Sequence, residues 1–140
     1  MEHSTFDRIF AALATLAVAA GTAAGFWVLG TPGQQRLIMS DQQRLEDLSA
    51  IANSLYWQSQ DQDDYALPDV LDTTNQRQDP ITQESYSYRK VDDERYELCA
   101  SFATDSSTHK LANANNQNWQ HPNGQHCFEL ELSQPPPPLY

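Results

Sequence analysis

An uncharged apolar segment near the N-terminus constrains this chain more than any other feature. Residues 9–29 contain no charged side chain. As an α-helix, 21 residues rise about 31 Å, which is the thickness of the hydrocarbon core of a bilayer. We therefore predict a transmembrane helix over residues 9–30, after a short N-terminal segment of residues 1–8.

A cleaved signal peptide is the main alternative for this segment. Residues 17–19 read Ala-Val-Ala, which matches the small-residue pattern of a cleavage site. However, the apolar run continues for ten residues beyond that point, and the leader carries Glu2 and Asp7 beside its single Arg8. We interpret the segment as an uncleaved anchor that lies in the lipid bilayer.

The segment is also rich in small residues. Alanine inserts into a membrane less favourably than leucine, so this helix is a marginal span by itself and would gain from protein neighbours. Small residues at three- and four-residue spacing let another helix approach closely. The predicted packing face consists of Ala14, Ala17, Gly21 and Gly25; the alternative is a small-residue helix without a partner.

The orientation of the anchor depends mainly on two cysteines. Arg8 precedes the segment whereas Arg36 and Arg44 follow it, so the distribution of basic residues hardly decides the orientation of the helix in the membrane. Cys99 and Cys127 predict a disulfide, worth on the order of 3 kcal/mol for a loop of about 28 residues. We expect a cytoplasmic N-terminus and a periplasmic domain at a bacterial inner membrane, with two reduced thiols in the cytoplasm as the alternative.

The balance of charge excludes one class of partner. The chain has 8 Lys and Arg against 19 Asp and Glu, a formal net charge of -11, which repels nucleic acid. The acids are dispersed, and this favours a solvated surface over a dedicated acidic docking face. They include Asp41, Glu46, Asp47, Asp61, Asp63, Asp64, Asp92, Asp93, Glu94 and Glu97.

Residues 31–132 are predicted to form an α+β domain outside the membrane. Thr31 and Pro32 suit the start of a helix, and apolar residues then recur every three or four positions over residues 34–58. This pattern predicts an amphipathic helix, although Ser40 and Gln43 have capping-box spacing and allow a restart there.

A small antiparallel sheet of about three strands is predicted to follow this helix. Residues 86–91, 96–102 and 125–132 alternate between apolar and polar side chains. Residues 92–95 suit a hairpin loop, and residues 103–118 suit a long polar loop. The proline-rich tail, residues 133–140, is expected to be extended polyproline II, either free or laid against a partner.

This order of elements resembles the type IV pilins and the pseudopilins of type II secretion. The resemblance covers residues 34–132, and its motifs are Leu67-Pro68 and Asp79-Pro80 leading into residues 86–88. It implies a component of a secretion or filament system. Pilin precursors carry a glutamate near the start of the hydrophobic helix, whereas residues 9–29 hold no acid, so we interpret the domain as pilin-like on a non-pilin anchor.

The sequence contains no motif for catalysis, a cofactor or a metal. Candidate metal ligands lack CxxC or HExxH spacing, and the carboxylates near residue 93 read as solvated charge. We expect no enzyme activity, cofactor or metal site. The ligands considered are His109, His121, His126, Cys99 and Cys127.

Function is therefore predicted from architecture. We expect a non-catalytic accessory or structural subunit of a larger respiratory, photosynthetic or secretory membrane complex, which binds other subunits through its helix and its domain. Trp57 and Trp119 fit the core pattern least well, and each is either an interface anchor or part of a small core. An envelope ligand-binding protein is a further alternative, for which the amide-rich residues 113–118 are the only indication.

Overall fold

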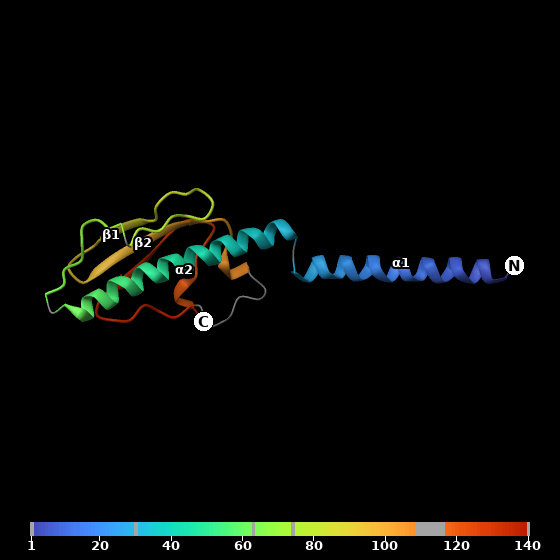
Figure 1. Ribbon diagram of the computed structural model, residues 1–140, viewed down its shortest axis with the longest axis horizontal. Coiled ribbons are helices and arrows are strands. Elements are labelled where there is room, and N and C mark those ends of the chain that lie inside the picture. The colour runs from blue at the N-terminus through green and yellow to red at the C-terminus, as the bar shows by residue number, and fades with distance from the viewer. Residues whose placement is uncertain (1, 30, 63, 74, 109–116, 140) are drawn as a thin grey trace. The chain divides into compact units, whose positions relative to one another are not determined.

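The structure is a computed structural model that describes residues 2–29, 31–62, 64–73, 75–108 and 117–139. The chain divides into two compact units, Met1–Arg36 and Leu37–Tyr140, and each is described by itself. Seven helices and strands are seen in this part of the chain, in the order α1, α2, β1, β2, η1, η2, β3 (Figure 1). The two 3₁₀ helices are η1, Ser106–Thr108, and η2, Gln117–Trp119.

Helix α1, Glu2–Leu29, is long and apolar enough to cross a membrane. It starts before the predicted span because residues 2–8 contain no proline or glycine that would break the helix. The hydroxyls of Thr15 and Thr22 donate to the carbonyls of Ala11 and Val18, four residues earlier. These polar groups therefore have partners within the helix itself.

Helix α2, Pro32–Asp61, begins where the sequence indicates. Thr31 accepts a hydrogen bond at Oγ1 from the backbone N–H of Gln34 (3.3 Å), as an N-cap does. The helix is continuous through Ser40, whose hydroxyl donates to the carbonyl of Leu37. The predicted alternative of a restart at Ser40 is therefore wrong.

Three antiparallel strands form one sheet in the order β1, β2, β3. They are β1, Ser87–Lys90; β2, Arg95–Phe102; and β3, Gly124–Glu131. Asp92 closes the hairpin between β1 and β2, because its Oδ1 accepts the N–H groups of Glu94 and Arg95. Gly124 has φ 101°, a conformation that favours glycine, and this turns the chain into β3.

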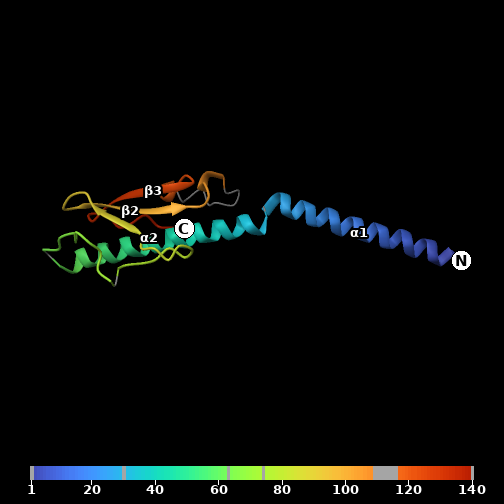
Figure 2. The ribbon, with the colours of Figure 1, turned by 90° about the horizontal axis from the view of Figure 1, so that it is seen from above.

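The hydrophobic core lies between α2 and one face of the sheet (Figure 2). Helix α2 contributes a stripe at three- and four-residue spacing, and the sheet contributes alternate residues of β2 and β3. The predicted α+β class and three-stranded sheet are thus confirmed. The buried side chains include Leu45, Leu48, Ile51, Leu55, Tyr96, Leu98, Phe102, Trp119, Phe128 and Leu130.

The segment between α2 and β1 contains no helix and little strand pairing in its described residues. It is nevertheless held in place, since Leu67 and Leu71 are buried in the core. At its end, the N–H of Asp79 donates to the carbonyl of Glu84 and the N–H of Gln83 donates to the carbonyl of Asp79. This tight turn places Asp79 against α2.

Candidate functional site

The most unusual group in the domain is a buried cluster of three charged side chains, Asp41, Arg44 and Asp79. Their exposed fractions are 1%, 4% and 7%. Arg44 Nη1 lies 2.6 Å from Asp41 Oδ1, and its Nη2 lies 3.1 Å from Asp79 Oδ1, while its Nε also binds Asp79. One guanidinium therefore joins two carboxylates that lie far apart in the sequence.

Backbone donors complete the cluster. Asp41 accepts the N–H of Ala103 (2.9 Å) and both the N–H and the hydroxyl of Thr104 (2.8 and 2.6 Å). Asp79 Oδ1 accepts the N–H groups of Ile81 and Thr82 (2.8 and 2.9 Å). With every carboxylate oxygen already bonded, the cluster is suited to holding α2 and two loops together and is unsuited to general acid or base chemistry.

The surroundings lower the pKa of Asp79. Burial raises the pKa of this carboxyl, but the hydrogen bonds from Arg44, Thr82 and Ile81 outweigh burial and bring its pKa to about 2. The folded pKa lies below the value of 3.8 for an unperturbed aspartate. Ionised Asp79 therefore stabilises the fold at neutral pH, by about 2 kcal/mol.

Acid is expected to remove this contribution. The stabilisation by Asp79 is complete above about pH 5 and is lost as the pH falls from about 4 to 2. In this range the unfolded state binds a proton at Asp79 that the folded state does not bind. Thermal melting of wild type and Asp79→Asn at pH 6, 4 and 2.5 checks this. The difference in stability between the two proteins should shrink towards pH 2.5; a constant difference would exclude the assigned role.

A second carboxylate on α2 binds the same region of the chain. Asp47 accepts a hydrogen bond from the hydroxyl of Tyr86 (3.0 Å) and one from Nη1 of Arg77 (3.0 Å). Burial, together with the nearby charge of Asp47, raises the pKa of Tyr86. Asp47 therefore fastens the segment before β1 to the helix.

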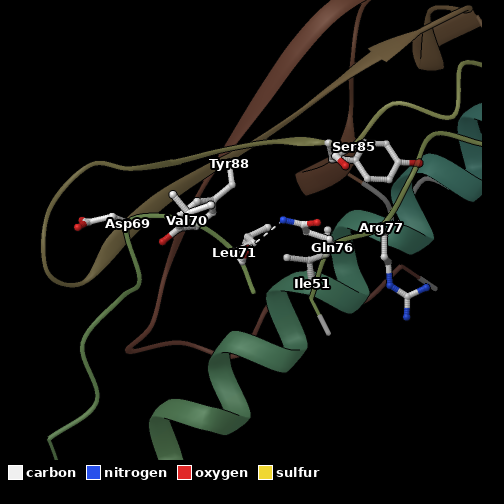
Figure 3. A pocket seen from close by; sticks show the side chains of 9 residues that line it. Ile51, Asp69, Val70, Leu71, Gln76, Arg77, Ser85 and Tyr88 are labelled. Atoms are coloured by element: carbon white, nitrogen blue, oxygen red, sulfur yellow. Dashed lines mark hydrogen bonds between the residues drawn. The ribbon is translucent and has the colours of Figure 1, made fainter. Parts of the chain in front are cut away.

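A pocket of about 210 Å³ lies beside this contact (Figure 3). Two of its polar groups are already bonded within the domain: Gln76 Nε2 donates to the carbonyl of Leu71 (3.1 Å), and the hydroxyl of Tyr88 donates to the carbonyl of Pro68 (2.7 Å). The pocket is smaller than a typical site for a drug-sized ligand. It is lined by Ile51, Asp69, Val70, Leu71, Gln76, Arg77, Ser85, Tyr86 and Tyr88.

A wider, open groove of about 500 Å³ follows the first turns of α2 in the domain. Ile38 and Met39 give it an apolar end, and Glu46, Asp47 and Arg77 give it a charged end. Met39 is strongly exposed. The groove brings together no nucleophile and base among its described residues.

The predicted packing face of α1 is open. An added Cβ at Gly21 or Gly25 would meet no atom within 4 Å. Ala14 and Ala17 are exposed on the same helix. The structure therefore leaves room for a close neighbour along this stripe.

The predicted disulfide between Cys99 and Cys127 is confirmed. The two residues are direct partners in the register of β2 and β3. A carboxylate oxygen of Glu97 and both sulfurs lie within 4.8 Å of one another, but the sulfurs are bonded to each other and offer no thiolate for a metal.

The predicted histidine candidates do not form a shared site in the described residues. His121 is buried and stacks on Phe102 with ring centroids 3.7 Å apart. His126 lies on β3 and packs edge to face on Phe128. His109, and most of the amide-rich loop considered for ligand binding, lie outside the described residues.

The two tryptophans considered as interface anchors, Trp57 and Trp119, have different environments. Trp57 is 62% exposed near the end of α2 and packs edge to face on Tyr56. Trp119 is 1% exposed, and the interface hypothesis for Trp119 is wrong because the C-terminal tail covers it. Its Nε1 donates to the carbonyl of Pro137 (2.9 Å).

Sequence reasoning missed the buried cluster and placed Asp41 on the solvated surface. The available signal was the position of Asp41 and Arg44, three residues apart and directly before the core residue Leu45. Such a pair is normally exposed, so its burial depends on Asp79 and the loop at Thr104, which the spacing does not reveal.

Comparison with protein-family models, curated proteins and solved structures finds no match for this chain.

Proposed function

We propose that the chain is a single-pass membrane protein that serves as a non-catalytic accessory or structural subunit of a larger bacterial membrane complex. Helix α1 carries the proposal: it is apolar and long enough to span a bilayer, and its stripe of small residues is open to another helix. The extramembrane domain would add contacts through Trp57 and the groove at Met39.

The disulfide supports the proposed location of the domain. Disulfides persist in oxidising compartments such as the periplasm, and they are rare in the cytoplasm. The bond between Cys99 and Cys127 therefore favours a periplasmic domain at the inner membrane, with the N-terminus in the cytoplasm. In this setting the complex would be respiratory, photosynthetic or secretory.

The test is association in mild detergent. At native expression, the wild-type chain should purify with stoichiometric partner subunits. The double variant Gly21→Leu/Gly25→Leu should weaken this association about 5- to 30-fold, because the new side chains prevent close approach of a neighbouring helix. Quantitative mass spectrometry of the purified material measures the loss.

The matched control is Ala19→Leu/Ala23→Leu. It adds two leucines at the same spacing on the opposite face of the helix and leaves the small-residue stripe unchanged. A clean monomer at native expression, or an equal loss in both double variants, would contradict the proposal.

A pilin-like component of a secretion or filament system is the second candidate. It is favoured by the long N-terminal helix, by the packing of α2 on a small antiparallel sheet and by the late disulfide. Intact-mass measurement separates the two candidates, since a pilin is processed before its hydrophobic helix. A mass that still includes residues 1–8 argues against a processed pilin.

A further inference from the structure

An aromatic pair in the domain is contacted by the tail of the same chain. Trp119, in the short helix η2 (Gln117–Trp119), packs on Phe128 of β3 with ring centroids 4.9 Å apart. The tail returns after β3 and ends beside η2 (Figure 1). Its Pro137 accepts the hydrogen bond of the Trp119 indole, and its Leu139 packs against the core.

The sequence of the tail suits a bound polyproline segment and does not suit a paired β-strand. Residues 135–138 are four consecutive prolines, which have no N–H and cannot extend the sheet as a paired strand. The described chain contains no cis peptide bond, so this run is suited to polyproline II, whose carbonyls have no internal partners. Such carbonyls are free to accept a hydrogen bond from a protein donor.

The contact combines the two elements that proline-rich recognition uses. Domains that bind proline-rich segments present aromatic side chains to the rings, and the preformed helix of the segment reduces the entropy lost on binding. Here Trp119 and Phe128 are the aromatic pair next to the tail, and the indole N–H of Trp119 is the donor. Pro136 and Pro137 are half-buried, while Pro135 and Pro138 are exposed.

We propose that the surface at Trp119 is a binding site for proline-rich segments in the polyproline II conformation, and that the chain's own tail, residues 134–139, occupies it as a tethered inhibitor. A short tether gives an effective concentration in the millimolar range. A partner segment therefore enters only if it binds more tightly than the tail or if the tail is drawn away. This surface is distinct from α1, on which the proposed function rests.

The experiment compares the full chain with a variant that ends at Ser133, both in detergent micelles and labelled with ¹⁵N at the tryptophan indoles. The probe is the peptide SQPPPPLY, and the control is SQAAAALY. The truncated variant should show a saturable shift of the Trp119 resonance with the proline peptide. The full chain should need at least tenfold more peptide, because the tail competes.

Two substitutions locate the site. Trp119→Phe removes both the indole donor and its resonance, so peptide binding by the substituted proteins is measured by isothermal titration calorimetry. This variant should bind the proline peptide about fivefold more weakly, as loss of one hydrogen bond predicts. Trp57→Phe makes the same change on the exposed surface and should leave binding unchanged. Each substitution also assigns one indole resonance.

The proposal is overturned if the truncated variant melts cooperatively, with its disulfide intact, and shows no Trp119 shift up to millimolar peptide. Equal binding of both peptides overturns it as well. If truncation unfolds the domain, a full-length variant with Gly and Ser at residues 134–139 takes its place. Should that variant also fail to fold, the tail is an inseparable part of the core and the proposal is rejected.

Discussion

Replacing Arg44 by leucine is expected to lower the free energy of unfolding by about 3 to 5 kcal/mol. The substitution leaves the carboxylates of Asp41 and Asp79 buried without their shared cation. Urea unfolding of the full chain in mild detergent, followed by tryptophan fluorescence, measures the loss because Trp119 is buried in the core.

Arg89→Leu is the matched control. Arg89 forms an ion pair with Glu97 at 2.6 Å, as close as the pair between Arg44 and Asp41, but its side chain is 68% exposed. An exposed pair contributes at most about 1 kcal/mol. Equal losses in the two variants would contradict the view that burial gives the cluster its importance.

Loss of the disulfide is the second large effect that we expect. The bond closes a sequence separation of 28 residues, so the chain-entropy model assigns it about 3 to 4 kcal/mol. Cys99→Ala/Cys127→Ala should lower the free energy of unfolding by this amount. A domain with one small core cannot readily compensate such a loss.

Reduction of the disulfide provides an independent check on this loss in the free energy of unfolding. Dithiothreitol should bring the wild-type protein to the stability of the double variant and leave the variant unchanged. Identical unfolding curves for wild type with and without reductant would show that the bond does not contribute.

Local patterns in the sequence predicted most of the fold. The stripe of α2 at three- and four-residue spacing and the alternation of β2 and β3 depend on the immediate neighbours in the chain, so the helix and the sheet were located within a few residues. Thr31 and Gly124 mark the ends of elements for equally local reasons.

The contacts between distant segments could not be predicted. Asp41 resembles any other surface acid until Thr104 is brought against it from 63 residues away and Asp79 binds its partner Arg44 across 35 residues. Trp119 likewise resembles a surface anchor until Pro137 is placed over it. Residue spacing along the chain carries no information about these long-range contacts, which form only when the domain packs.

The cluster at Asp41 also determines which changes the two loops can tolerate. Its donors at residues 81, 82, 103 and 104 are backbone N–H groups, apart from the one hydroxyl of Thr104. The side chains of Ile81 and Ala103 take no part in these bonds, whereas proline at any of these four positions removes a donor. An inserted or deleted residue displaces a donor in the same way. The loops are constrained in length and in their exclusion of proline, much more than in residue type.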